Sequence, residues 1–454
     1  MIYLYLLIFG IIAGVLISCK RVKKVEVKQP DSEVKHPEWS KNAVIYEVNV
    51  RQYSKEGTFK AFEKDLPRLK ELGIDILWIM PVHPIGMKER KGKLGSYYAV
   101  KDYRAINPEF GTIDDFKHLV KSAHALGLKV IIDWVANHTS WDNNLMTTHP
   151  EYYMKDTAGK YVSPYDWTDV VRLDYSKPEV NRYMTETMKW WVSETDIDGF
   201  RCDVASMVPV SFWDALRPEL EKVKPVFMLA EADMPELQKK AFDMSYDWKF
   251  HHIMNDIAKS KKKATVVMKH FNWVDSVYPG NAYLMQFTSN HDENSWNGSE
   301  SERLGQGVKP FAVLAATVPG MLMMYNGQES AFKRRLQFFE KDSIDWADYP
   351  LTDFYKKLIS LKKRNVALWN GNEGGNIQPV SISHDSLAIA YIRQKDTQKV
   401  LVVLNLSAKQ LNINLKSDDM AGEYTELFTG TLRSFGKKEK LVLKPWEYLV
   451  FEKR

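Results

Sequence analysis

Eight strongly apolar runs recur between residues 43 and 327 of this chain, most of them separated by segments long enough to form a helix. Runs with so few polar residues are typical of strands that are buried on both faces of a parallel sheet. The runs span residues 43–50, 74–82, 128–135, 196–204, 225–231, 242–248, 282–290 and 320–327. Eight alternating β and α units predict a closed (β/α)₈ TIM barrel. The alternative is an open doubly wound sheet, but no G-x-G-x-x-G follows the first run.

The predicted catalytic barrel occupies residues 41–370, and two other regions differ from it in pattern. Residues 137–178 are rich in Trp, Tyr, Asp and Pro, which predicts an inserted subdomain after the third strand. Beyond residue 370 the runs become short and alternating, as in LAIAYIRQ and VLVVLNL. This pattern predicts a C-terminal antiparallel β-sandwich domain over residues 371–454.

The N-terminal segment indicates export. Residues 1–18 contain no charged side chain, and the run ends in Leu16-Ile17-Ser18-Cys19. This ending resembles a bacterial lipobox, which implies a lipoprotein signal peptide over residues 1–19, lipidation of Cys19 and a tether over residues 20–40. The expected location is therefore the membrane, facing the periplasm or the cell surface. An uncleaved apolar anchor is the alternative, because no Lys or Arg precedes the run.

Charge and cysteine content exclude two other classes of protein. Five of the Lys and Arg residues and one Glu fall within residues 20–30, so most of the net charge of +5 lies in the tether. The nearly neutral remainder lacks the basic surface of a nucleic-acid-binding protein. The only cysteine besides Cys19 is Cys202, so the chain has no disulfide framework.

The segment GFRCDVAS, residues 199–206, places Arg201 two residues before Asp203 in a predicted strand. Alternate side chains of a strand point to opposite faces, so Arg201 and Asp203 share one face while Cys202 points to the other. We expect the arginine to lower the pKa of Asp203 and keep it ionised. A fixed, ionised carboxylate can act as a nucleophile, although a structural ion pair is the alternative for so short a pattern.

Acidic residues also end other predicted strands: Asp133 in DWVANH, Glu231 in LAEAD and Asp292 in SNHDEN. Catalytic groups of (β/α)₈ barrels lie at the C-terminal ends of the strands. Several carboxylates at these ends suit glycoside hydrolysis, which needs one carboxylate as nucleophile and a second, protonated one as acid.

Four of these segments resemble the signature segments of glycoside hydrolase family 13, the α-amylase family, and the resemblance extends across residues 43–454. In chain order the four are DWVANH, GFRCDVAS, AEAD and SNHDEN. The resemblance implies a retaining α-glycoside hydrolase that acts on α-1,4 and/or α-1,6 bonds of α-glucans or maltooligosaccharides. It implies a covalent glycosyl-enzyme on Asp203, acid/base catalysis by Glu231 and stabilisation of the oxocarbenium-like sugar by Asp292. The other roles that it implies are substrate binding by Tyr98, His138, Arg201 and His291, and structural support by Asp102 and Asp133.

Some positions depart from the family pattern. Ser206 and Met207 replace a Lys-His pair that often forms the acceptor side and contributes to a calcium site together with the residue matching Asn137. We therefore assign no metal and expect no required cofactor, with calcium left as an option. Val204 directly follows the expected nucleophile, and family members that act on α-1,6 bonds often carry valine there. Together these departures predict a preference for short oligosaccharides over starch, with some α-1,6 cleavage.

Two other functions fit the same sequence. One is a transglycosylase or isomerase of the trehalose-synthase kind on the same scaffold. The other is a non-catalytic sugar-binding protein, which the presence of all three expected catalytic carboxylates disfavours. The aromatic residues of the insertion fit either sugar platforms or packing within it; they are Trp141, Tyr152, Tyr153, Tyr165 and Trp167.

Overall fold

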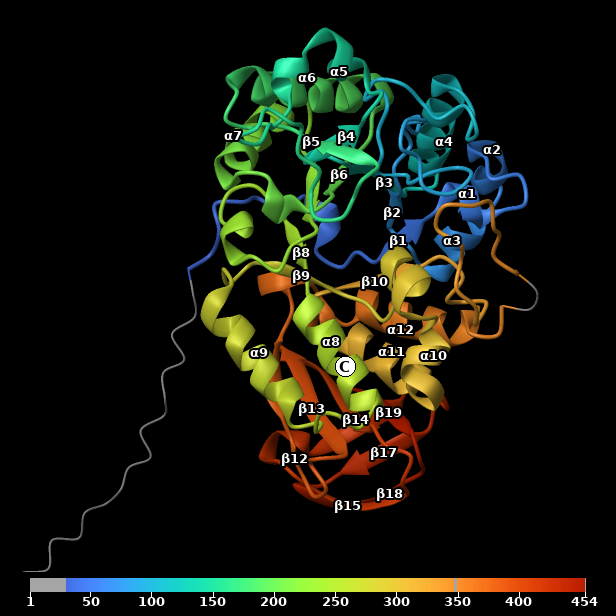
Figure 1. Ribbon diagram of the computed structural model, residues 1–454. Helices are drawn as coiled ribbons and strands as arrows, with labels where there is room; N and C mark the ends of the chain where they lie inside the picture. The colour runs from blue at the N-terminus through green and yellow to red at the C-terminus, as the bar shows by residue number, and fades with distance from the viewer. Residues whose placement is uncertain (1–29, 347–348, 454) are drawn as a thin grey trace, which may run out of the picture.

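The computed structural model describes residues 30–346 and 349–453, and it confirms the predicted barrel. Eight parallel strands close in the order β1-β10-β9-β8-β7-β6-β3-β2 (Figure 1). Each strand lies within one of the eight apolar runs of the sequence. The strands are β1 (Ile45–Val48), β2 (Ile76–Ile79), β3 (Lys129–Trp134), β6 (Gly199–Cys202), β7 (Phe227–Ala230), β8 (Met244–Tyr246), β9 (Tyr283–Gln286) and β10 (Met321–Tyr325).

Helices follow most of the strands and pack against the outside of the barrel. The β7 strand is the exception, because only a short 3₁₀ turn, η4 (Pro235–Gln238), precedes β8. Helix α4 begins at a capping box in which Thr112 and Asp115 satisfy each other's backbone N–H groups. The helices are α1 (Val50–Tyr53), α2 (Phe59–Glu63), α3 (Leu66–Leu72), α4 (Ile113–Ala125), α6 (Pro178–Thr195), α7 (Val210–Glu221), α8 (Trp248–Ala258), α9 (Val266–Val277), α10 (Glu300–Leu304), α11 (Val308–Thr317) and α12 (Thr352–Arg364).

The segment between β3 and α6 leaves the barrel at the C-terminal end of β3. It contains a two-stranded antiparallel sheet of β4 (His138–Ser140) and β5 (Val170–Arg172), together with α5 (Asn144–Thr148) and the turn η2 (Pro150–Tyr152). His138 pairs with Arg172 in this sheet, so the insertion fixes a polar side chain directly beside the barrel mouth.

The C-terminal region forms two antiparallel sheets, as expected, and lies at the bottom of Figure 1. One sheet has the strand order β11-β13-β14-β19-β16-β17 and the other β12-β15-β18. Side chains such as Leu401, Ile413 and Phe451 form a separate apolar core between them. The strands are β11 (Asn376–Pro379), β12 (Ser381–Ile382), β13 (Ala388–Lys395), β14 (Gln398–Asn405), β15 (Leu411–Lys416), β16 (Gly422–Glu426), β17 (Leu432–Phe435), β18 (Lys438–Leu443) and β19 (Tyr448–Lys453).

The first described residues run along the face of the barrel where the strands begin. The backbone N–H of Ser32 donates to the side chain of Asn281, which precedes β9. The N–H of Glu33 donates to the carbonyl of Lys239, which precedes β8. The signal peptide, Cys19 and residues 20–29 of the tether lie outside the described residues.

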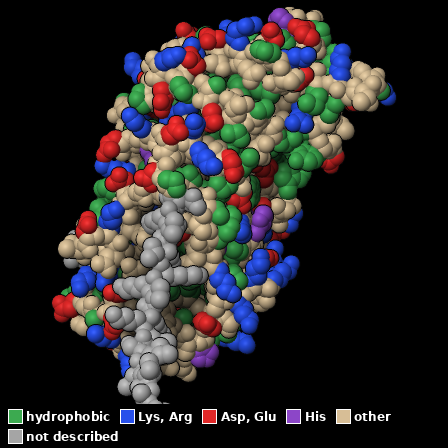
Figure 2. Space-filling view, turned by 90° about the vertical axis from the view of Figure 1, so that its left-hand side faces the viewer, with side chains coloured by type: hydrophobic (Ala, Val, Ile, Leu, Met, Phe, Trp, Pro, Cys, Tyr) green, Lys and Arg blue, Asp and Glu red, His purple; other side chains and the backbone are tan. Residues whose placement is uncertain are grey.

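None of the helices in the described part of the chain is long and apolar enough to cross a membrane. The face of the molecule that Figure 2 shows carries acidic and basic side chains in mixture. The insertion and the loops after β2, β9 and β10 surround the opposite end of the barrel, where the candidate site lies.

Candidate active site

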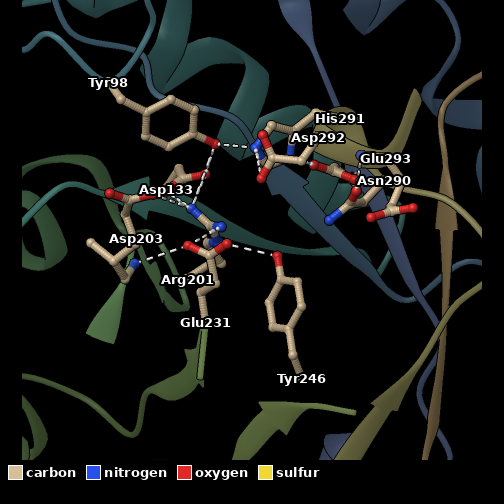
Figure 3. A network of polar contacts seen from close by, with 12 residues as sticks. Tyr98, Asp133, Arg201, Asp203, Glu231, Tyr246, Asn290, His291, Asp292 and Glu293 are labelled. Atoms are coloured by element: carbon tan, nitrogen blue, oxygen red, sulfur yellow. Dashed lines mark hydrogen bonds and ion pairs between the residues drawn. The ribbon is translucent and has the colours of Figure 1, made fainter. Parts of the chain in front are cut away.

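Arg201, in β6, lies at the centre of a buried polar network at the C-terminal end of the barrel (Figure 3). Its Nη1 lies 2.8 Å from Asp133 and 3.1 Å from Asp203, and its Nη2 lies 2.8 Å from Glu231. Its Nε donates to the hydroxyl of Tyr246, at the end of β8. The arginine side chain is fully buried, so these contacts replace its hydration. Polar side chains at or just after the ends of four strands therefore contact one guanidinium.

Asp203 and Glu231 directly follow the ends of the neighbouring strands β6 and β7. The N–H of Asp203 donates to the carbonyl of Trp134, and the N–H of Glu231 donates to the carbonyl of Cys202, which fixes both backbones. Between them Val204 has φ 36° and ψ 48°, a left-handed conformation that is unfavourable for a β-branched residue. In this conformation its N–H donates to Oε2 of Glu231, at 2.9 Å. The strained residue thus orients the second carboxylate beside the first.

The expectation that Arg201 lowers the pKa of Asp203 was wrong in its net direction. Burial and the nearby charge of Glu231 raise the pKa of Asp203 well above its usual value, although Arg201 acts in the opposite sense. Arg201 does not outweigh these two effects, because its single guanidinium contacts several carboxylates and makes its shortest contacts with Asp133 and Glu231. Glycoside hydrolysis begins with one of its two carboxylates protonated and the other ionised.

His291 and Asp292 follow β9 and form the other side of the network. His291 places Nδ1 2.5 Å from Oε1 of Glu47 and Nε2 2.8 Å from the hydroxyl of Tyr98. Burial would lower the pKa of His291, but Asp292 and Glu47 raise it to about 9. His291 is therefore an imidazolium at neutral pH, held between the barrel interior and the mouth.

The remaining residues that the sequence analysis named divide into two groups. Tyr98 and His138 reach the site: both line the same cleft as Asp203. Burial lowers the pKa of His138 to about 3, so this histidine is neutral. Asp133 is fully buried below the cleft, where it accepts from Trp78, Tyr98 and Arg201. Asp102 binds the N–H of Arg104 and the amide of Asn144 instead, so it braces the insertion and does not enter the cleft.

The cleft above this network has a volume of about 480 Å³, within the range of small-molecule sites. Sequence reasoning missed several of its residues, because they lie in loops without a recognisable motif. Trp167 was named only as one of five aromatic candidates; it lines the cleft, whereas Tyr152 and Tyr153 are buried by packing. The side chains that line the cleft are Lys91, Ser96, Tyr98, His138, Asp166, Trp167, Asp169, Val170, Asp203, Val204, Glu231, His291, Asp292, Trp296, Phe338 and Phe339.

No group of three or more His, Cys, Asp or Glu side chains among residues 30–346 and 349–453 has the arrangement of a metal site. The amide of Asn137, the position considered for calcium, contacts Nδ1 of His138.

A (β/α)₈ barrel in which paired carboxylates surround a buried arginine at the strand ends defines a class of carboxylate-dependent glycoside hydrolases. The family model for the alpha amylase catalytic domain matches residues 40–159 and 151–375, and the model for the alpha-amylase SusG C-terminal domain matches residues 389–450. The chain belongs to the alpha-amylase family and is a glycoside hydrolase.

Individual relatives agree with this assignment. A noncanonic maltogenic alpha-amylase from Thermotoga neapolitana is 30% identical, with a TM-score of 0.82, over 90% of this chain and 98% of that one. An alpha-amylase from Lactobacillus plantarum is 31% identical, with a TM-score of 0.81, over 92% of this chain and all of that one. Alpha-amylase 2 of Dictyoglomus thermophilum is 25% identical over 87% of this chain and 74% of its own length. The chain covers 59% of alpha-amylase MalA of Haloarcula japonica, at 25% identity.

Proposed function

We propose that this enzyme hydrolyses α-glucosidic bonds of maltooligosaccharides and related α-glucans with retention of anomeric configuration. The observation that carries the proposal is the placement of Asp203 and Glu231 on adjacent strand ends, both lining one cleft and both in contact with Arg201. The relatives named above are alpha-amylases, one of them maltogenic, which supports an α-glucan as the substrate.

In the first step, Asp203 attacks the anomeric carbon while Glu231 donates a proton to the leaving glycosidic oxygen, which gives a glycosyl-enzyme ester. In the second step, Glu231 takes a proton from water, and the resulting nucleophile releases the sugar from Asp203. Asp292 stabilises the positive charge that develops on the oxocarbenium-like sugar, while Arg201 orients Asp203 and Glu231 from below the cleft. His138, His291 and Tyr98 are placed to bind its hydroxyl groups and its ring.

We also propose that short oligosaccharides are preferred over starch and that some α-1,6 bonds are cleaved. Val204 lines the cleft and presents methyl groups where a threonine would offer a hydroxyl to the acceptor sugar. One such hydrogen bond is worth about 1 kcal/mol, enough to bias the choice of bond. Catalytic efficiencies on isomaltose, panose, maltotriose and soluble starch measure this preference.

The stereochemical outcome tests the central proposal. Proton NMR of the first product from maltotriose should show the α anomer, and Glu231→Gln should lower kcat about 10²–10⁴-fold. Asp203→Asn should remove activity with little change in thermal unfolding, whereas Asp256→Asn, a surface carboxylate paired with Lys262, should remain active. A β anomer, or an active Asp203→Asn enzyme, would contradict the mechanism.

We further propose that the protein is exported and held at the membrane through lipid on Cys19. The described chain begins against the loops that precede β8 and β9, on the face opposite the catalytic cleft. The twelve residues from Cys19 to Pro30 span at most about 40 Å when fully extended. Such a tether would keep the N-terminal face of the barrel toward the membrane and the cleft toward the medium.

The anchoring proposal is tested by cell fractionation. Cys19→Ala should release the protein from the membrane fraction or block its processing, while Ser18→Ala, which keeps the cysteine, should behave as the parent protein. Unchanged retention and mobility of the Cys19→Ala protein would instead indicate an uncleaved apolar anchor.

A further inference from the structure

Loop 86–95, which follows β2, crosses one side of the catalytic cleft and is bound to a different neighbour at each end. At its start, the N–H of Met87 donates to the carboxylate of Asp142 in the insertion, at 3.0 Å. Near its end, the N–H of Leu94 donates to the carbonyl of Phe339, and the N–H of Lys93 to Oε1 of Glu340. The loop therefore connects the insertion with the segment after β10.

The side chain of Lys91 extends from this loop to the insertion. Its Nζ lies 3.3 Å from Oδ1 of Asp169 and 3.5 Å from the carbonyl oxygen of Asp166. All three residues line the same cleft as Asp203 and Glu231. The lysine thus forms part of the wall of the cleft, with its charge neutralised by Asp169.

On the other side, the loop packs against aromatic residues that extend the wall. Gly92 has φ +64°, and a side chain there would meet Cβ of Phe339 at 2.5 Å, so the two backbones are in close contact. Trp296 packs against Phe338 and Phe339 with tilted rings, whose centroids lie 5.2 and 5.7 Å away. Phe338 in turn lies nearly parallel to the ring of Tyr98. Trp296 is 51% exposed, so this wall presents an aromatic surface to solvent at its upper edge.

We propose that loop 86–95 closes the catalytic cleft on this side, with Lys91 as the closing side chain, so that the enzyme reaches only bonds near an end of a glucan chain. The inference rests on the proposed α-glucan hydrolysis and adds its mode of attack. A polymer that binds across the cleft has to leave it at both sides. In this proposal, the continuous contact from Asp169 through Lys91 and Gly92 to Phe339 blocks one of these two exits.

The loop has its own anchors, so removal of the lysine side chain opens the wall without unfolding it. Arg90 donates to the carbonyl of Gly86 within the loop and to that of Ile85 just before it, and the backbone bonds of Met87 and Leu94 remain in place. Lys91→Ala therefore removes the bridge alone. Lys88→Ala is the matched control, because Lys88 lies in the same loop but faces the ring of Trp141 outside the cleft.

The test compares polymer and oligosaccharide cleavage in the parent enzyme and the two variants. With maltoheptaose labelled at the reducing end, the parent should release one product length, and the iodine colour of amylose should fall slowly relative to reducing ends formed. Lys91→Ala should raise the ratio of kcat/KM for amylose over maltotriose roughly tenfold and produce mixed lengths, while Lys88→Ala should match the parent.

Rapid loss of iodine colour with the parent enzyme would overturn the inference, as would an unchanged ratio in Lys91→Ala. Either result leaves the proposed hydrolysis intact, because activity on maltotriose is measured in the same series. Failure of the proposed function would appear separately, as absence of maltotriose cleavage by the parent enzyme.

Discussion

At the scale of single residues, the site depends on charges that are buried next to one another. Glu47 and His291 are separated by 244 positions in the chain, yet their side chains are in hydrogen-bond contact and almost fully buried. Burial raises the pKa of Glu47, and His291 opposes that rise. Glu47 fixes the imidazolium of His291, which faces Tyr98 and Asp292. Glu47 therefore supports the site without lining the cleft.

This pair predicts a pH dependence of stability. The pKa of His291 is about 9 in the folded protein and about 6.5 when unfolded, so its contribution to the free energy of unfolding is complete below pH about 6.5 and is lost as pH rises through about 9. Glu47→Gln removes one of the charges that raise this pKa, and the loss should move to lower pH. Urea unfolding between pH 6 and 10 measures the effect.

The control for this prediction is Glu329→Gln. Glu329 is equally buried but binds Arg68 and Tyr46, which do not titrate in this range. Its substitution should lower stability without changing the pH profile. Identical profiles for Glu47→Gln and the parent protein would contradict the assigned role of Glu47.

At the scale of secondary-structure elements, the beginning of β6 requires a residue without a side chain. Gly199 has φ +147° and pairs with Phe227 in the parallel ladder between β6 and β7. A Cβ atom at this position would lie 1.9 Å from the carbonyl oxygen of Phe227. The same short strand carries Arg201 and leads to Asp203, so its fit against β7 also sets the position of the proposed catalytic groups.

Gly199→Ala should therefore destabilise the fold by about 2–4 kcal/mol, from backbone strain and overpacking together. Gly159→Ala is the control, since its φ is +78° but no atom lies within 4 Å of the added Cβ. That substitution should cost only about 1–2 kcal/mol. Chemical denaturation of both variants measures the difference, and equal losses would show that the contact with Phe227 does not matter.

At the scale of the whole molecule, a buried arginine joins the barrel to the C-terminal sheets. Arg393, in β13, donates to the carbonyls of Gly375 and Thr317, the second of which ends α11. Burial lowers the pKa of Arg393 to about 10, which reflects the cost of holding this charge at the boundary between the two regions.

Arg393→Met should lower the free energy of unfolding by about 1–3 kcal/mol, because two buried carbonyls lose their donor while the desolvated charge is also removed. Arg433→Met in the same region is the control: Arg433 is only half-buried, over the ring of Phe435, and its loss should change stability by about 0.5 kcal/mol or less. A loss no larger than that of the control would indicate that the buried arginine does not join the two regions.

The sequence alone was sufficient to predict the barrel, its eight strands and the positions of the carboxylates. Strand periodicity and apolar content are local properties, and a residue such as Asp203 or Glu231 that ends a strand reaches the C-terminal face whatever the details of packing. The family resemblance then implied their roles, which the proposed experiments test.

Only the tertiary structure decided how these groups influence one another. The sequence placed Arg201 beside Asp203, but burial and Glu231 determine the direction of the pKa shift, since desolvation depends on every element packed around the site. Glu47, Lys91, Trp296 and Phe338 carry no motif and join the site through contacts between distant segments. Such contacts depend on how loops from distant parts of the chain pack against one another, which local sequence periodicity does not encode.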